Sequence, residues 1–408
     1  MSFAVLCALS CSLWIKVTLA SHGKIEIRTY MKKNTQYQDR ARGMLIGLAI
    51  GDALGAPVQF GNSSESISNN IDELKHMHDN HILPKGVWTD DTSMALCIAD
   101  SLIECNGYDS YDVMNKYVDW VAYGYRSYFD YGYDIGTQTI RSINLYRREA
   151  IIPKSAKKEW SAGNGAIMRL APVIIANTFP SVEYNPKRIT DTELKPLEEM
   201  AILSCRETHN SIVAECVTGM FATVLFAAIR GFNKTDICSY AERGAWLDNE
   251  EYDKFWLDNV DSLVNRWRKR DSYDMKDLGG YIVDSYAIAM WGFINSDSFE
   301  DGMYKVLCLG GDTDTNAAIY GQLAGAYYGY DAIPKEWIKD VYLSNEIIEI
   351  ADKLLEMKEC PIIRTRFEDD EHFVDMNNKS ATSKSSYKDD DIVSVGELLK
   401  KYRPKEKQ

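Results

Sequence analysis

Several common kinds of site are missing from this sequence. None of its nine cysteines forms a CxxC pair, which excludes the usual zinc and thiol-redox motifs. Lysine and arginine number 46 against 60 aspartates and glutamates, and the net charge of −14 argues against a general nucleic-acid-binding surface. An odd number of cysteines without the spacing of a disulfide framework favours a reducing compartment, so we expect a cytoplasmic protein.

The N-terminal segment leaves two interpretations open. Residues Phe3 to Ala20 are largely apolar and end in small residues, as a secretory signal with its cleavage site would. However, no basic residue precedes this run, Lys16 interrupts it, and it is short for a membrane span. We therefore assign residues 1–38 to a possible signal segment or to an N-terminal extension. A misplaced start codon is the remaining explanation for the apolar run. No membrane span is expected.

Strand patterns are scarce, with Lys24 to Arg28 the only plausible one, and patterns of helical length dominate. The clearest apolar runs of that length are Leu45–Leu54, Met94–Ile103, Val213–Ile229, Ile282–Phe293 and Ala317–Tyr328. We expect an all-α fold, a single compact multi-helix domain over residues 39–364. The charged segment 365–408 has the composition of a disordered tail.

Glycine recurs at every fourth residue in two of these runs. The two ladders are Gly43, Gly47, Gly51 and Gly55, and Gly321, Gly325 and Gly329. This spacing places the glycines of each ladder on one helix face, where each costs the helix about 1 kcal/mol relative to alanine. Close approach of another helix backbone is the simplest compensation, and we expect it to bring neighbouring site loops together.

Two short clusters of acids and threonines each lead into an apolar helical run. They are Thr89-Asp90-Asp91-Thr92 and Asp312-Thr313-Asp314-Thr315. A single acid there would be an ordinary helix N-cap, and this interpretation stays open, although two acids exceed what one cap requires. Carboxylate and hydroxyl oxygens are the ligands that Mg2+ prefers. If the clusters meet in space, their four carboxylates suffice for a two-metal site.

Three further segments are candidates for contact with a ligand. In Ser161 to Arg169 (SAGNGAIMR), small residues precede a helical run, and backbone N–H groups at such a turn suit a phosphate, although an ordinary turn is equally compatible. The tyrosine- and glycine-rich segment Tyr123 to Gly136 predicts a loop along a cleft, where Asp134 supplies a carboxylate or a helix cap. His209 lies in a long apolar context and is either a ligand or a core histidine.

Taken in chain order, these motifs resemble the ADP-ribosylglycohydrolase family. That family includes the dinitrogenase reductase-activating glycohydrolase and the hydrolases that remove ADP-ribose from arginine or serine. The matching segments are Gly43–Phe60, Trp88–Ser101, Asp134–Thr139, Ser161–Val173, Thr208-His209 and Gly310–Ala318. The resemblance implies an all-α fold with two Mg2+ ions, or Mn2+, in a central cleft.

The resemblance also implies roles for individual residues. The metal ligands would be Thr89, Asp90, Asp91, Asp312, Asp314 and Thr315. The substrate-binding residues would be Gln59, Ser161, Gly163, Asn164, Gly165 and His209, with the 161–165 turn cradling the diphosphate and ribose. The catalytic carboxylates would be Asp90, Asp91, Asp134 and Asp314.

One position departs from the family pattern. Many members have a glutamate where this chain has Gln59. Glutamine keeps the shape of glutamate but loses its charge and cannot act as a base. Either Asp90, Asp91 or Asp134 then carries the proton transfer, or activity is low or lost.

The expected function is metal-dependent hydrolysis of the glycosidic bond between ADP-ribose and an acceptor. The acceptor would be a modified protein side chain or a small ADP-ribosyl compound. The alternative is a catalytically weak or inactive protein that binds ADP-ribose or serves a structural role. A metal phosphohydrolase would also explain the acids and the phosphate-binding turn, but it fits the order of the motifs poorly. Nothing in the sequence specifies an oligomeric state.

Overall fold

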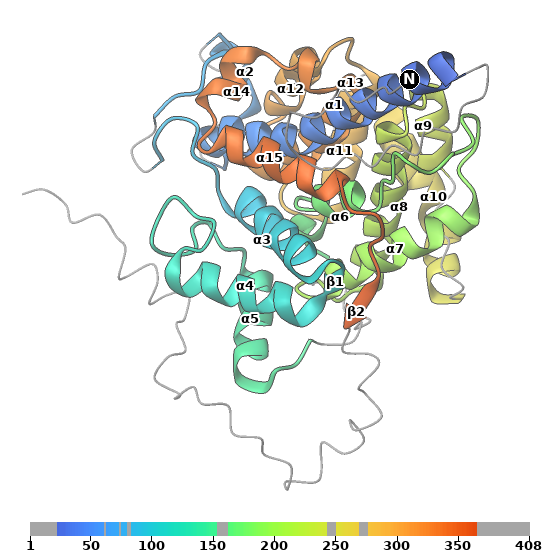
Figure 1. The fold of residues 1–408 in the computed structure, drawn as a ribbon. Coiled ribbons are helices and arrows are strands. Elements are labelled where there is room, and N and C mark those ends of the chain that lie inside the picture. The colour runs from blue at the N-terminus through green and yellow to red at the C-terminus, as the bar shows by residue number, and fades with distance from the viewer. Residues whose placement is uncertain are drawn as a thin grey trace, which may run out of the picture.

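The computed structural model describes residues 23–60, 63–72, 75–79, 83–152, 162–242, 250–268 and 276–364, and this part of the chain is almost entirely helical (Figure 1). The all-α prediction is therefore confirmed. Ser161, the apolar N-terminal run and the charged tail 365–408 lie outside the described residues.

Fifteen α-helices are described, joined by short 3-10 turns. In chain order they are α1 (Gly23–Gly55), α2 (Ser64–Asn69), α3 (Asp90–Cys105), α4 (Ser110–Tyr123), α5 (Thr137–Glu149), α6 (Ala171–Ala176), α7 (Asp191–Arg206), α8 (Ile212–Ile229), α9 (Lys234–Ala241), α10 (Glu250–Arg268), α11 (Ile282–Ile294), α12 (Phe299–Leu307), α13 (Thr313–Tyr328), α14 (Lys335–Asp340) and α15 (Ser344–Leu355). All five apolar runs singled out in the sequence lie in helices.

The strand expected at Lys24 to Arg28 is wrong, because these residues belong to the first turns of α1. A short alternating pattern carries little weight against the helix that follows it without interruption. The described strands are β1 (Tyr108–Asp109) and β2 (Ile362–Arg364), which pair in parallel. Both are too short for a sequence pattern to reveal.

The two glycine ladders meet at the contact between α1 and α13. A Cβ atom on Gly43 would collide with the carbonyl oxygen of Gly325, and one on Gly325 would collide with that of Gly43. At the end of α1, a Cβ on Gly55 would collide with the backbone of Asp314. The predicted close approach of helix backbones is confirmed, and it fixes the end of α1 against the start of α13.

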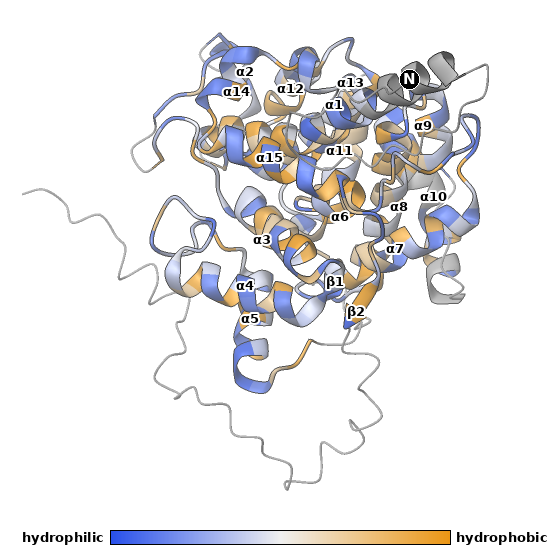
Figure 2. Cartoon of the chain, viewed as in Figure 1, coloured by the Kyte–Doolittle hydropathy of each residue, from blue (hydrophilic) through white to orange (hydrophobic). Residues whose placement is uncertain are grey.

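Burial explains why two helices are unusually apolar. Thr35–Val58 and Ile212–Ile229 are long and apolar enough to cross a membrane, but 83% and 89% of their apolar windows are buried inside the protein. Burial to this extent is typical of core helices in a folded domain. Outer helices are amphipathic instead, as α15 shows in Figure 2, where hydrophobic and hydrophilic residues alternate around the helix.

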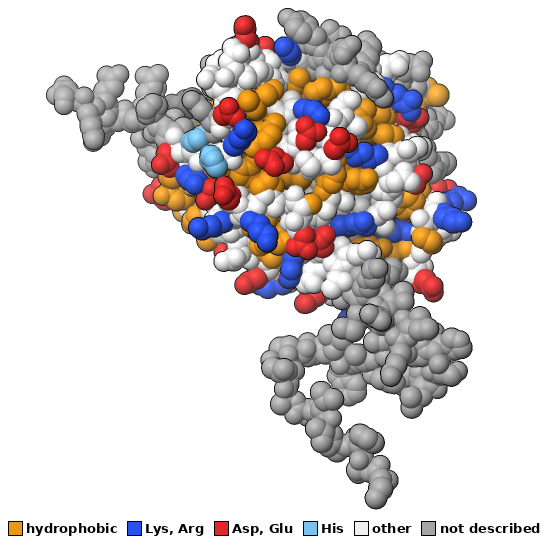
Figure 3. All heavy atoms as spheres, turned by 90° about the horizontal axis from the view of Figure 1, so that it is seen from above, with side chains coloured by type: hydrophobic (Ala, Val, Ile, Leu, Met, Phe, Trp, Pro, Cys, Tyr) orange, Lys and Arg blue, Asp and Glu red, His pale blue; other side chains and the backbone are white. Residues whose placement is uncertain are grey.

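Surface charge is mixed on the face seen in Figure 3, where acidic and basic side chains lie side by side rather than in one basic patch. That the chain has no general nucleic-acid surface stays a prediction from its net charge.

Candidate functional site

A buried aspartate from α1 holds the start of α3 in place. One carboxylate oxygen of Asp52 accepts the backbone N–H (2.8 Å) and hydroxyl (2.9 Å) of Thr89. The other accepts the backbone N–H (3.0 Å) and hydroxyl (2.7 Å) of Thr92. Asp52 thus caps α3 from another helix. Burial raises the pKa of Asp52 to about 6, and the hydrogen bonds from the two threonines partly offset this effect.

Asp90 and Asp91 occupy the first turn of α3, and both are buried. Burial raises the pKa of Asp90 well above its usual value, and the charges of Asp134 and Asp314 raise it further. Burial, followed by the charges of Asp52 and Asp90, raises the pKa of Asp91. The Oδ1 atom of Asp91 is buried and has no hydrogen-bond partner within the described part of the chain. Burying an ionised carboxylate oxygen without a partner is unfavourable, and a nearby cation would stabilise it.

The second acid cluster begins α13 after a tight glycine turn. Gly310 and Gly311 both have left-handed backbone angles, with φ of 74° and 75°. The side-chain amide of Asn164 donates a 2.8 Å hydrogen bond to Asp312 Oδ2. Burial raises the pKa of Asp314 well above its usual value, and the charges of Asp312 and Asp91 add to the effect. Thr315 lies in the same first turn and is buried.

The fold brings the two clusters near each other, because Asp52 of α1 holds the start of α3 and Gly55, three residues further along α1, contacts the backbone of Asp314. Their donor set consists of carboxylate and hydroxyl oxygens, which suits a hard divalent cation. No group of three or more Asp, Glu, His or Cys side chains in the described ranges is gathered closely enough to hold an ion as it stands. Mg2+ commonly uses only one or two carboxylates and keeps several waters, so these residues still fit it.

The turn Gly163-Asn164-Gly165 lies next to this acidic centre. The Asn164 amide nitrogen donates to Ser285 (3.0 Å) as well as to Asp312, and its backbone N–H donates to the carbonyl of Gly280 (2.9 Å). The imidazole of His209 packs against the turn. A Cβ on Gly165 would fall 2.6 Å from the Cε1 atom of that ring, so the turn needs glycine at this position.

The hydrogen bonds around His209 fix its protonation. Arg169 donates a 2.6 Å hydrogen bond to the Thr208 hydroxyl oxygen. That hydroxyl can then give its own proton to Nδ1 of His209, 2.8 Å away, which leaves the ring proton on Nε2. Burial and the nearby charge of Arg169 lower the pKa of His209 to about 3. The neutral imidazole is therefore favoured at physiological pH, and its Nε2–H can donate a hydrogen bond.

Gln59 and Asp134 meet at the edge of the acidic centre, where the Gln59 amide donates a short hydrogen bond to Asp134 Oδ2. Asp134 has a left-handed backbone conformation (φ 60°), which non-glycine residues adopt infrequently. Loss of solvation of its carboxyl within the surrounding protein raises the pKa of Asp134, while the hydrogen bond from Gln59 lowers it. Asp134 is more exposed than the four acids of α3 and α13.

The loop between α4 and α5, residues 124–136, carries Asp134 and is fastened to two helices. Arg126 forms a bidentate ion pair with Asp100 of α3 (2.5 and 2.7 Å) and also contacts Glu346 of α15. Beyond this anchor the loop is aromatic. Phe129 packs 5.1 Å from the Tyr133 ring, measured between ring centres. The predicted loop is confirmed for residues 124–136, whereas Tyr123 ends α4, and a cleft along the loop stays a prediction.

Sequence reasoning missed the residues that support the site. Asp52 interrupts an apolar run, which was the available signal. Gln322 of α13 is a second supporting residue that was missed. Its buried amide accepts the Ala171 N–H (2.8 Å) and donates to the Met168 carbonyl (2.7 Å). One helix thus carries Asp314 and also holds the segment that follows the Asn164 turn.

The chain is similar to several known proteins over most of its length. The chain is 31% identical over 323 residues to an ADP-ribosylarginine hydrolase of Pseudomonas putida, and the match covers 79% of each chain. It is 28% identical to the ADP-ribosyl-[dinitrogen reductase] glycohydrolase of Rhodospirillum rubrum, over 78% of this chain and 96% of that protein. A solved structure named as an ADP-ribosylglycohydrolase-related protein complex matches with a TM-score of 0.60 and 33% identity, covering 80% of this chain and all of that one. The ADP-ribosylglycohydrolase family model matches residues 33–361, and the chain belongs to this family of hydrolases.

Proposed function

We propose that this protein is a metal-dependent hydrolase that cleaves the glycosidic bond between ADP-ribose and a modified acceptor. The observation that carries the proposal is the juxtaposition of four buried aspartates, two at the start of α3 and two at the start of α13. They lie beside the Asn164 turn, which Asp312 contacts directly. A cluster of like charges in a buried position is costly unless cations balance it.

The resemblance to the family suggests the ligand sets for two cations. Thr89, Asp90 and Asp91 would hold one ion, and Asp312, Asp314 and Thr315 would hold the other. Bound Mg2+ or Mn2+ would supply charge neutralisation and orientation of the ribose hydroxyls and a water. The partnerless Oδ1 of Asp91 is the atom that most clearly supports such an ion.

In this proposal His209 binds the substrate and Asp134 transfers the proton. The neutral Nε2–H of His209, held by Thr208, is a donor for a substrate oxygen beside the turn. Positive charge developing on the ribose as the leaving group departs would be stabilised by the carboxylates around it. Asp134 is the carboxylate best placed to take a proton from water, because it lies at the exposed edge of the centre.

A hydrolysis assay with and without divalent cation tests the proposal. Arginine-linked ADP-ribose is the first substrate to try, because the Pseudomonas putida relative is named for that activity. We expect release of ADP-ribose with Mg2+, loss of activity in EDTA, and a higher melting temperature with Mg2+ than with EDTA. Equal melting curves in both conditions would remove the metal from the proposal.

A variant pair tests the site itself. Asp312→Asn keeps the shape of the side chain and an oxygen that can still accept from Asn164, but it removes one charge. We expect it to fold normally and to lose at least about a hundredfold in turnover, as removal of an electrostatic group from an active site commonly does. Asp331→Asn, an exposed position, is the control and should behave as wild type. Wild-type turnover by Asp312→Asn would refute the assignment.

Gln59 supports a second candidate function, ADP-ribose binding without catalysis. Its amide occupies a position where many members of the family have glutamate, and it bonds to Asp134 instead of providing a second carboxylate. Binding of free ADP-ribose together with no release from arginine-, serine- or small-molecule-linked substrates would favour this function. We place the protein in the cytoplasm, which the seven free cysteines within the described residues support.

A further inference from the structure

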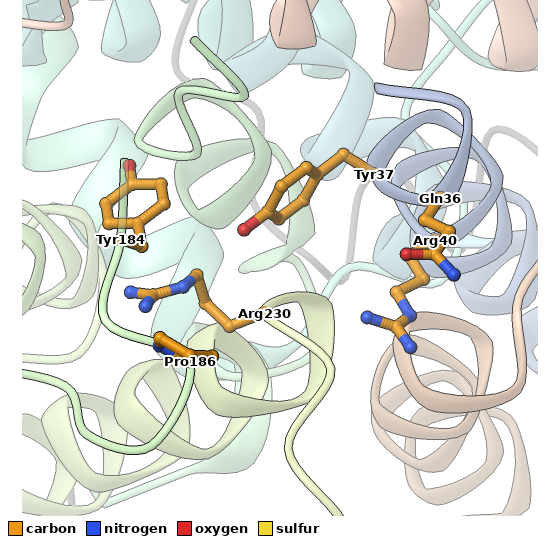
Figure 4. A pocket seen from close by; sticks show the side chains of 6 residues that line it. All are labelled: Gln36, Tyr37, Arg40, Tyr184, Pro186 and Arg230. Carbon is orange, nitrogen blue, oxygen red and sulfur yellow. The ribbon is translucent and has the colours of Figure 1, made fainter. Parts of the chain in front are cut away.

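A polar cavity lies far along α1 from the acidic centre. Gln36, Tyr37 and Arg40 of α1 line one side, and Tyr184, Pro186 and Arg230 line the other (Figure 4). Its volume is about 150 Å3. At a rise of about 1.5 Å per residue, Arg40 and Asp52 are separated by roughly 18 Å along the helix axis. No acidic side chain is among the residues that line this cavity.

Arg230 forms a fixed wall of the cavity. Its side chain is only 1% exposed and pairs with Glu193 at 2.8 Å, while its second terminal nitrogen donates to the carbonyl of Asn185 at 2.9 Å. The guanidinium also lies 3.9 Å from the centre of the Tyr184 ring. These partners satisfy Arg230 within the fold, so it contributes positive potential rather than a new binding group.

Arg40 has far fewer partners. It is half-buried, and its one hydrogen bond within the described chain is a long contact of 3.4 Å from Nη1 to the Ile229 carbonyl. It forms no ion pair with a described residue. Arg42, two residues along the same helix, pairs instead with both carboxylate oxygens of Asp352. Burial lowers the pKa of Arg40, and the electrostatic interactions with Tyr37 and Asp39 partly offset this effect.

We propose that this cavity binds a small oxyanion, a phosphate or carboxylate group, with Arg40 as the principal donor. A guanidinium presents a planar fork of N–H groups that matches either anion. The volume accommodates a group of that size but not ADP-ribose, and the distance from the acidic centre separates the two sites. The cavity is thus an accessory site, independent of the proposed hydrolysis.

Thermal unfolding in the presence of anions tests the proposal directly. The probes are inorganic phosphate and acetate, each compared with sodium chloride at equal ionic strength. A ligand that binds only the folded protein raises the melting temperature as its concentration rises. The variants are Arg40→Gln, which removes the charge and the fork, and Arg42→Gln as the matched control on the same helix.

We expect phosphate, acetate or both to raise the melting temperature of wild type and Arg42→Gln but not that of Arg40→Gln. The anion that acts identifies the tetrahedral or the planar group as the ligand. Arg40→Lys keeps the charge without the fork and serves if Arg40→Gln does not fold. Its apparent affinity should be about tenfold weaker, as expected for loss of one charge-assisted hydrogen bond. A response that is equal in all variants, or absent from wild type, would overturn the proposal.

Discussion

The side-chain amide of Gln59 donates a hydrogen bond to the carboxylate of Asp134, joining the segment after α1 to the loop before α5. This bond favours the ionised form of Asp134 and lowers its pKa against the effect of the surrounding protein. A glutamine here therefore keeps Asp134 ready to accept a proton, although it cannot itself act as a base.

Replacing Gln59 by glutamate should change both stability and rate. Without metal, two carboxylates would face each other, and we expect a lower melting temperature than in wild type. With saturating Mg2+, the added negative charge should raise turnover about tenfold by stabilising positive charge on the ribose. Gln59→Ala, which removes the hydrogen bond without adding charge, should lower turnover. If Gln59→Glu leaves kcat unchanged, the existing aspartates already supply all the charge that the reaction uses.

Asp52→Asn should damage the site from outside it. The variant places an amide N–H opposite the N–H and hydroxyl of either Thr89 or Thr92, where the carboxylate oxygen now accepts two hydrogen bonds. We expect a loss of about 2 kcal/mol in the free energy of unfolding, as for removal of a buried cap. Urea unfolding measures this, with the exposed Asp331→Asn as the reference.

Turnover of Asp52→Asn should also fall at temperatures where the variant is fully folded. Asp52 holds Thr89, and Asp90 and Asp91 follow Thr89 directly at the start of α3. A stability equal to that of Asp331→Asn would show that the four hydrogen bonds to Asp52 contribute little.

The glycine contact between α1 and α13 predicts a large difference between two chemically identical substitutions. In Gly325→Ala the new methyl group would collide with the backbone of Gly43, which cannot move without separating the helices. We expect a loss of about 3 kcal/mol, typical of overpacking in a rigid contact. In Gly279→Ala the methyl group meets nothing within 4 Å, and stability should be unchanged or slightly higher. Urea unfolding of the two variants decides, and equal stabilities would contradict the contact.

The features that the sequence revealed are those with a local physical cause. Glycine at every fourth residue lowers the stability of a helix, and close contact with another helix backbone is the simplest compensation. The ladders therefore predicted a helix pair without identifying the partner helix. Apolar runs of helical length predicted helices because their length and pattern are also local properties of the sequence. Lys24 to Arg28 misled because its alternation is short, and a strand forms only where a partner strand is present.

The features that the sequence did not reveal depend on distant partners. Asp52 has its role only because Thr89, which lies 37 residues later in the chain and precedes α3, comes beside it in the fold. Arg126 fastens the Asp134 loop only because Asp100 and Glu346 come within reach. The neutral state of His209 likewise depends on Arg169 and a threonine hydroxyl, which no motif would indicate.

Glu207, next to Thr208, is a buried acid with a clear consequence for stability. It is fully buried, and the Tyr108 hydroxyl donates a 2.6 Å hydrogen bond to its Oε1 atom. Burial raises the pKa of Glu207 to about 8, from 4.5 for the unperturbed side chain. Between these two pH values the folded protein holds a proton that the unfolded chain has released. Stability from this group is therefore complete below pH 4.5 and is lost as pH rises toward 8.

Glu207→Gln should remove that dependence, because glutamine does not titrate. The free energy of unfolding of wild type minus that of the variant should fall between pH 5 and 8, with a slope of at most about 1.4 kcal/mol per pH unit. Urea titrations at several pH values measure the difference. The acids of α3 and α13 titrate in both proteins and cancel in the comparison. Glu349→Gln, an exposed position on α15, is the control and should parallel wild type throughout. If Glu207→Gln also parallels wild type across this range, Glu207 is ionised in the folded protein and its burial is compensated by neighbouring charge.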